Sequence, residues 1–243
     1  GLIVLLLLGF TLRTYQLAAQ SLWYDEAISW HLTRMTLPQL TEWTANDIQP
    51  PLYYYLLWLW VRLAGTSEFA LRFPSVAFAW LTLPLLWRLG RRLFGSTAGW
   101  LVLVFGILSP LQVYYAQEAR MYTLLTLLGL ASSALLYRID TRLSPVSPRD
   151  GDLPVPRDEQ RFQALAVAYV LTTVAALYTH YFAFFLLAAQ GATVIYWFGS
   201  HRFAILRRSR LERPTDARLR TAGEANRPTW KYGLLIPLTI LAL

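Results

Sequence analysis

Apolar runs of membrane-spanning length recur along the whole 243-residue chain and constrain its fold more than any other feature. A transmembrane helix needs about 20 mainly apolar residues, and several such runs do not fit the core of one soluble domain. Only 15% of the residues are charged, against roughly 25% in soluble domains. The predicted fold class is therefore all-α, a polytopic transmembrane helical bundle. Its candidate spans are residues 1–12, 74–90, 98–115, 121–137, 164–180, 181–198 and 232–243.

The sequence begins and ends inside apolar runs, so we expect residues 1–243 to be a single transmembrane domain truncated at both ends. The first run has no basic segment before it and no small-residue cleavage site, which favours a membrane span over a signal peptide. The chain contains no cysteine. A disulfide, a thiolate nucleophile and a Cys-type zinc site are therefore excluded.

The basic residues predict which loops share a side of the membrane. Most of the 22 Lys and Arg lie in three segments, 88–97, 138–163 and 199–231. Short basic loops stay in the cytoplasm. If the apolar run 52–64 does not cross, all three segments lie on the cytoplasmic side, whereas if it crosses they point outward and break this rule. We therefore predict that 52–64 lies at the outer interface and that 139–163 and 199–231 are cytoplasmic connections. Anionic inner-leaflet lipid then accounts for the net charge of +8, and nucleic-acid binding is not expected.

An Asp-Glu pair lies in the predicted outer loop, residues 13–73. Helical spacing places Asp25 and Glu26 near the same face as Ser29, with tryptophans on the opposite face. This pattern predicts a helix lying in the membrane interface, ended by Pro38. The two acids are either a solvated charge pair or include a general base, a role that suits a carboxylate whose pKa is raised by burial.

Further candidates lie at other predicted outer positions. Asp47 precedes two prolines and a tyrosine run, and is either an ordinary turn acid or a ligand for substrate. Glu118 and Arg120 lie in YYAQEARMY between two spans, where ionisable residues are costly and are functional candidates. They are either a mutual ion pair or snorkelling side chains, or they belong to a site in which the Arg120 guanidinium binds a phosphate. His180, at the next outer junction, is either structural or a donor toward substrate.

The order of several short motifs resembles a known family. They are WYDE, an acid followed by PPLYY from Asp47 to Tyr54, SEFALRFPS, LGRRLFG, YYAQEARMY and YTHYFAFF. This succession resembles bacterial membrane glycosyltransferases of the GT-C fold, in the family related to protein O-mannosyltransferases and the lipid A aminoarabinose transferase. The resemblance extends over essentially all 243 residues and corresponds to the N-terminal half of such an enzyme.

The resemblance implies a multi-pass enzyme of the bacterial cytoplasmic (inner) membrane that uses a polyprenyl-phosphate sugar at an extracytoplasmic active site. Asp25 matches the family's catalytic acid, and Asp47 matches the acid before Pro-Pro-Leu. Glu118 and Arg120 match the bacterial branch. Gln49 stands where the family often has histidine, so no imidazole role is expected at that position.

The resulting expectation is an inverting sugar transfer from a polyprenyl-phosphate donor to an acceptor hydroxyl. The expected partners are the lipid-linked donor, membrane lipids and an acceptor that is a glycan, a lipid or a protein. No cofactor is certain from the sequence, and a divalent metal stays open although no residue spacing supports a site for it. The expected catalytic residues are Asp25 and Glu26, and the expected substrate-binding residues are Asp47, Glu118, Arg120, Tyr122 and His180.

Two other functions remain open from the sequence. A transporter or flippase of a lipid-linked substrate would also have many spans, although charged residues near the midplane and internal repeats are more typical of transporters. A noncatalytic membrane scaffold would leave Asp25, Glu118 and Arg120 apart in space.

Overall fold

A computed structural model of the chain describes residues 1–143 and 159–211. Those residues form helices and no strand, which confirms the all-α fold class. The predicted span 232–243 and the segments 144–158 and 212–231 of the predicted connections lie outside the described residues. In chain order the helices are α1 (Leu2–Thr14), α2 (Tyr24–Thr33), α3 (Leu37–Ala45), α4 (Leu52–Ala64), α5 (Glu68–Phe94), α6 (Ser96–Leu108), α7 (Pro110–Ala116), α8 (Tyr122–Leu143), α9 (Glu159–Leu177) and α10 (Ala183–Leu211).

Three of these helices are long and apolar enough to cross a membrane, namely α5, α8 and α9. Helices α6 and α7 are bent by 54° at the break between them, and they add a fourth span if the pair is counted as one. The predicted span 98–115 is therefore broken, because Ser109 ends α6 and its hydroxyl caps α7, while Pro110 has no N–H to continue the first helix. Helix α1 and the apolar part of α10, Ala183–Trp197, are shorter.

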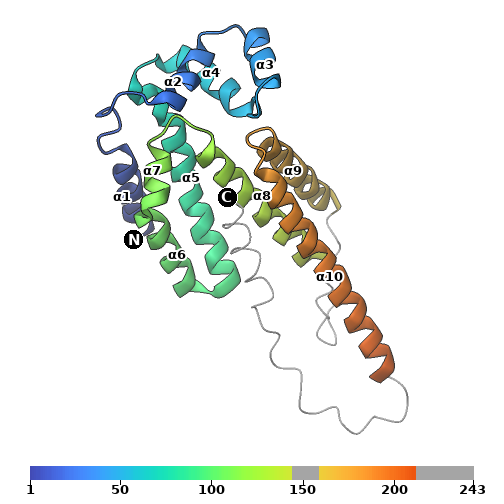
Figure 1. Cartoon of the computed structure of the whole chain (residues 1–243). Coiled ribbons are helices and arrows are strands. Elements are labelled where there is room, and N and C mark those ends of the chain that lie inside the picture. The colour runs from blue at the N-terminus through green and yellow to red at the C-terminus, as the bar shows by residue number, and fades with distance from the viewer. Residues whose placement is uncertain (144–158, 212–243) are drawn as a thin grey trace.

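The short helices α2, α3 and α4 lie together at one end of the bundle, which we call the cap (Figure 1). The α7–α8 and α9–α10 junctions lie at the same end, and the α5–α6 turn lies at the opposite end. The Leu52 N–H donates to the Tyr178 carbonyl at 2.9 Å and joins α4 to the α9–α10 junction. The predicted outer loop and both predicted outer junctions thus share one end of the molecule.

Helix α4 is too short to cross a bilayer. Its 13 residues span about 20 Å at 1.5 Å per residue, against a hydrocarbon core of about 30 Å. Tyr53, Tyr54 and Leu57 are fully buried and pack with Leu32 of α2 and Met121 of the α7–α8 junction. This core holds the cap on the ends of the long helices.

Close backbone packing joins α5 to α6 at the end away from the cap. A Cβ atom on Gly99 would lie 2.2 Å from the Arg91 Cγ and 3.0 Å from the Trp87 carbonyl oxygen. A Cβ on Gly90 would lie 3.2 Å from the Gly99 Cα. The two helices can therefore approach this closely only because neither glycine carries a side chain.

Buried polar side chains hold α8, α9 and α10 together. The Gln190 amide donates to the Ser132 hydroxyl at 2.9 Å and accepts from the Tyr169 hydroxyl at 2.9 Å. The Ser132 and Thr173 hydroxyls lie 2.9 Å apart. Within a bilayer, such interhelical hydrogen bonds satisfy groups that lipid cannot.

Arg13 is a second polar element of the bundle, fully buried in α1. Its guanidinium donates to the carbonyls of Gly9 at 3.0 Å and Gly106 at 2.8 Å. The second carbonyl belongs to the last turn of α6, where backbone acceptors have no partner within the helix. Arg13 therefore helps to stabilise the end of α6 at the break.

Candidate active site

Helix α2 turns its polar face into the protein. Glu26, Ser29 and Thr33 are all buried, so the alternative of a solvated charge pair does not hold for Glu26. The chain leaves α2 after Thr33, and Thr36 caps the next helix. Pro38 lies in the first turn of α3, where its missing N–H costs nothing. It therefore starts α3 rather than ending α2.

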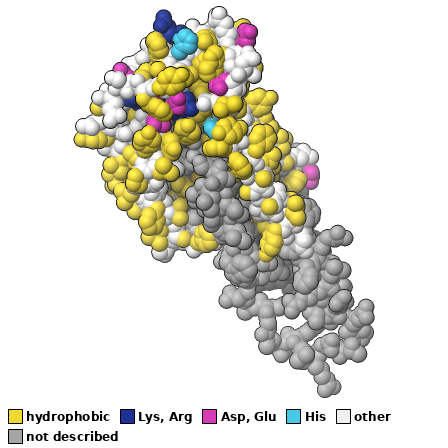
Figure 2. Space-filling model, in the orientation of Figure 1, with side chains coloured by type: hydrophobic (Ala, Val, Ile, Leu, Met, Phe, Trp, Pro, Cys, Tyr) yellow, Lys and Arg dark blue, Asp and Glu magenta, His cyan; other side chains and the backbone are white. Residues whose placement is uncertain are grey.

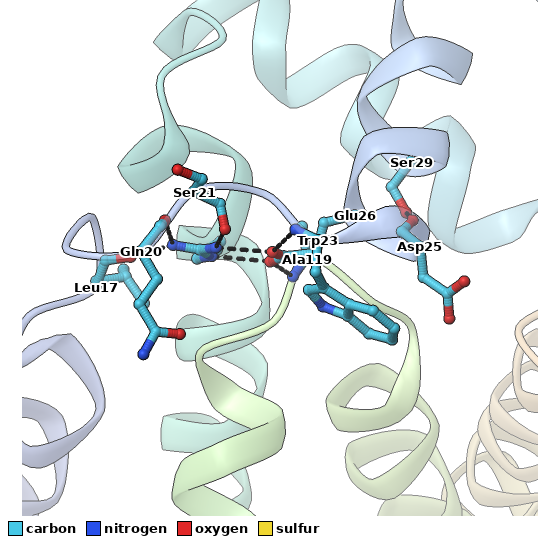
Figure 3. Close-up of polar contacts among 9 residues, drawn as sticks. Leu17, Gln20, Ser21, Trp23, Asp25, Glu26, Ser29 and Ala119 are labelled. Atoms are coloured by element: carbon cyan, nitrogen blue, oxygen red, sulfur yellow. Dashed lines mark hydrogen bonds and ion pairs between the residues drawn. The ribbon is translucent and has the colours of Figure 1, made fainter.

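Glu26 lies in a buried network that ties together four segments (Figure 3). Its Oε1 accepts from the Arg72 Nε at 2.8 Å and from the Ala119 N–H at 2.8 Å. Its Oε2 accepts from the Arg72 Nη2 at 2.7 Å and from the Trp23 N–H at 3.4 Å. The pair thereby fixes the start of α2 against α5 and the α7–α8 junction.

Arg72 has no hydrogen-bonding capacity to spare. Beyond Glu26 it donates to the carbonyls of Leu17 at 2.8 Å, Gln20 at 2.9 Å and Ser21 at 3.3 Å. Sequence reasoning did not single out this arginine. The available signal was its position inside an apolar helix, where a guanidinium needs a partner.

Asp25 points to the other side of α2, away from the Glu26 network (Figure 3). Its Oδ2 lies 3.5 Å from the Arg120 Nη2, and its side chain is 31% exposed, whereas that of Arg120 is 4% exposed. The structure thus places one carboxylate at the surface of the site and one cation beneath it. Its neighbour Glu26 has different partners, because successive residues of a helix point about 100° apart.

Arg120 is held by its backbone, while its guanidinium remains only partly paired. The Ser75 hydroxyl donates to the Arg120 carbonyl at 3.1 Å, and the Arg120 Nε is buried without a hydrogen-bond partner. Burial by itself lowers the pKa of Arg120, but the Tyr122 hydroxyl, Tyr54 and Asp25 outweigh it and raise this pKa. The guanidinium therefore stays charged and keeps free donor capacity.

Glu118 is buried near Arg120, but the ion pair that Arg120 makes among the described residues is with Asp25. Of the alternatives for these two residues, the mutual ion pair of Glu118 and Arg120 is therefore not the pair that the structure shows. Burial raises the pKa of Glu118, and the hydrogen bond from Tyr114 only partly opposes this.

Tyr122 and His180 extend the site toward the α9–α10 junction. The Arg120 Cζ lies 5.7 Å from the centre of the Tyr122 ring, and the rings of Tyr122 and His180 lie 6.0 Å apart. The Phe182 N–H donates to the His180 Nδ1 at 3.1 Å. A neutral His180 must then carry its proton on Nε2. Burial and the nearby Arg120 lower the pKa of His180 and favour this neutral form.

Asp47 lies at the C-terminal side of α3 and lines a pocket with Trp43 and four other residues. The Asp25 and Arg120 side chains do not line this pocket. Tyr54 lies within electrostatic range of both the pocket and the Asp25–Arg120 pair, since Arg120, Asp47 and Asp25 all influence the pKa of its buried phenol. Burial raises the pKa of Tyr54 to about 12, so its hydroxyl keeps its proton and donates to the Gln49 side chain.

The structure thus gathers five of the seven predicted site residues around Arg120, namely Asp25, Glu118, Arg120, Tyr122 and His180. Asp47 lines the separate pocket beside α3, and Glu26 pairs with Arg72. Among the described residues no group of three or more His, Cys, Asp and Glu side chains is arranged to hold a metal ion.

Comparison with known proteins gives one match. Residues 48–144 match the family model of dolichyl-phosphate-mannose-protein mannosyltransferases. The matched region contains Arg72, Glu118, Arg120 and Tyr122, but not Asp25 or His180, and it is less than half of the chain. No curated protein and no solved structure matches the chain significantly. The match and the candidate spans together support a multi-pass membrane protein with a glycosyltransferase-type function.

Proposed function

We propose that this protein transfers a sugar from a polyprenyl-phosphate donor to an acceptor hydroxyl at the cap end of the bundle, on the extracytoplasmic face of a bacterial inner membrane. The observation that carries this proposal is the contact between Asp25 and Arg120. A carboxylate that can accept a proton lies 3.5 Å from a buried guanidinium with an unpaired N–H. The family match of residues 48–144 points to the same class of donor.

The donor suits this position. A polyprenyl phosphate keeps its apolar tail in the bilayer and its charged headgroup at the interface. On the face that Figure 2 shows, the visible charged side chains gather mainly at the cap end, while hydrophobic side chains cover the helices below. A phosphate at the base of the cap would meet Arg120, whose planar donor array matches phosphate oxygens.

The proposed reaction is a single inverting displacement. The acceptor oxygen attacks the anomeric carbon on the face opposite the phosphate, and the bond between that carbon and the phosphate oxygen breaks. Asp25 takes the proton of the acceptor hydroxyl. The electron pair of the broken bond leaves with the polyprenyl phosphate, where Arg120 stabilises the growing negative charge. His180 is suited to donate its Nε2 proton in a hydrogen bond to the phosphate or to the sugar.

Glu26 has a different role in this scheme from the one expected for it. Both of its oxygens already accept hydrogen bonds from Arg72 and from backbone N–H groups, so it is poorly placed to take a proton from an acceptor. We infer that Glu26 is a positioning residue that holds α2 so that Asp25 faces Arg120. Glu118 is suited to hold the backbone turn before Arg120 or to bind a sugar hydroxyl.

The decisive experiment uses purified protein and labelled polyprenyl-phospho-mannose, with and without a chelator. Asp25→Asn should reduce transfer by roughly 10²–10⁴-fold and should leave donor binding intact. Glu68→Gln is the matched control, because Glu68 is an exposed acid at the start of α5. Unimpaired transfer by Asp25→Asn would remove Asp25 from the mechanism.

A vesicle translocation assay beside this transfer assay separates the enzyme from a flippase. Movement of the lipid-linked sugar without transfer would favour the flippase. The scaffold alternative required Asp25 and Arg120 to lie apart, and their contact of 3.5 Å argues against it.

A further inference from the structure

A pocket of about 580 Å³ opens beside α3 in the cap, separate from the Asp25–Arg120 pair. One wall residue, Trp43, is aromatic, and most of the others carry an amide or a carboxylate. The lining residues are Met35, Gln39, Glu42, Trp43, Asn46 and Asp47. Aromatic surface together with a few polar groups is typical of small-molecule sites.

The walls of this pocket are fixed to the rest of the cap. The Trp58 Nε1–H donates to the Met35 carbonyl at 2.8 Å, and the hydroxyls of Thr41 and Tyr55 lie 2.7 Å apart. Leu40, in the same helix, is fully buried and packs in the core of the cap. Since α3 is anchored to α4 in this way, the pocket is preformed and does not depend on ordering a loose loop.

The polar groups that line the pocket retain free capacity. The Gln39 oxygen caps α3 by accepting from Thr36, which leaves its NH₂ group as a donor. The Asn46 amide nitrogen donates to the Glu42 carbonyl, which leaves the Asn46 side-chain oxygen. One Asp47 oxygen accepts from the Ile48 N–H at 2.8 Å, which leaves the other. Donors and acceptors thus lie on the same pocket as an indole ring.

This combination matches a carbohydrate. A sugar ring has an apolar C–H face that packs on an aromatic ring, and hydroxyls that both donate and accept hydrogen bonds. The lining contains Glu42 and Asp47 but no basic residue, so an anionic ligand is disfavoured and an amino group is tolerated. We propose that this pocket binds a neutral or amino sugar unit of the acceptor.

The assignment of this pocket to the acceptor rests on the proposed glycosyl transfer. Asp47 on the pocket wall and Asp25 at the ion pair both interact electrostatically with the buried phenol of Tyr54. A sugar seated against Trp43 would therefore lie in the same cap as Asp25, and it is assigned to the acceptor because the donor phosphate is assigned to Arg120.

The test measures sugar binding directly and needs no transfer. Saturation-transfer NMR on the purified full chain would compare methyl glucoside, glucosamine and glucuronic acid. We expect signals from the first two and none from the third. Trp43→Ala should weaken binding of both by about tenfold, and Glu42→Gln should weaken glucosamine more than methyl glucoside.

Trp23→Ala is the matched control, because Trp23 is 45% exposed and does not line the pocket. Since Trp43→Ala can perturb α3, Glu42→Gln provides the second, nearly isosteric variant at an exposed residue. Equal binding of all three sugars, or unchanged binding in both pocket variants, would overturn the proposal. So would the finding that an acceptor peptide, and no sugar, protects Trp43 from oxidation.

Failure of this proposal and failure of the proposed function give different results. Sugar binding that depends on Trp43, without any transfer from the labelled donor, supports the pocket and contradicts the glycosyltransferase. Transfer that depends on Asp25, with no binding of sugars at Trp43, supports the enzyme and contradicts the pocket.

Discussion

The Glu26 carboxylate and the Arg72 guanidinium form a two-point contact across 46 residues of sequence, at 2.8 Å and 2.7 Å. Both side chains are almost fully buried, at 1% and 5% exposure. The contact joins the cap to the longest candidate span, α5. It therefore controls the orientation of α2, and with it the direction in which Asp25 points.

Breaking this pair should destabilise the protein strongly. Glu26→Gln leaves a buried guanidinium without its counter-charge, and we expect a loss of about 3–5 kcal/mol of unfolding free energy. Thermal unfolding in detergent measures it. The double variant Glu26→Gln with Arg72→Met should recover part of the loss, because no unpaired charge remains, while the carbonyls of Leu17, Gln20 and Ser21 lose their donor. A Glu26→Gln variant as stable as the wild type would contradict the assigned positioning role.

Substitution of Arg120 should act mainly on the donor. Arg120→Lys keeps the positive charge but loses the planar array of donors, and a hydrogen bond to a charged group contributes about 1.5–3 kcal/mol. We expect donor affinity to fall by roughly 10–100-fold, as measured by equilibrium binding of the labelled lipid. Arg62→Lys, at an exposed position on α4, serves as the control. Equal affinity of the Arg120 and Arg62 variants would argue against phosphate binding at Arg120.

His180 should make stability depend on pH on the acid side. Because burial lowers its pKa in the folded protein, the unfolded chain binds the proton more readily. Its contribution to stability is complete above the unfolded pKa of about 6.5 and is lost as pH falls through the lower folded value. His180→Asn should reduce this slope below about pH 6.5. An unchanged slope in melting temperature would mean that His180 is not buried in its neutral form.

Gly99 should tolerate no side chain. Gly99→Ala places a Cβ 2.2 Å from the Arg91 Cγ and 3.0 Å from the Trp87 carbonyl oxygen, and overpacking of this kind costs about 1–3 kcal/mol. Gly191→Ala in α10 is the matched control, because nothing lies within 4 Å of its added Cβ. Alanine there should be neutral or stabilising by up to about 1 kcal/mol. Equal melting temperatures of the two variants would contradict the close α5–α6 packing.

Much of the fold follows from local sequence, since the length and composition of an apolar run determine whether its backbone must be helical in lipid. The run around residues 74–90 became α5, and the 13 residues of α4 match the apolar run 52–64. The break within 98–115 was also marked in the sequence by Ser109 and Pro110. The pattern of apolar runs did not predict how far α8 and α10 continue, to Leu143 and Leu211. Polar residues mark the end of an apolar run, but they do not end a helix.

The sequence alone determined which residues could act as a base or bind a phosphate, and at which end of the bundle they would meet. Only the tertiary structure decided their partners. Glu26 and Asp25 are adjacent in sequence, yet one is tied to Arg72 and the other faces Arg120. Likewise, Arg120 is two residues from Glu118 but pairs with Asp25. The physical reason is that a helix rotates successive side chains to different faces, while the choice of a buried ion pair depends on which distant helix packs against each face.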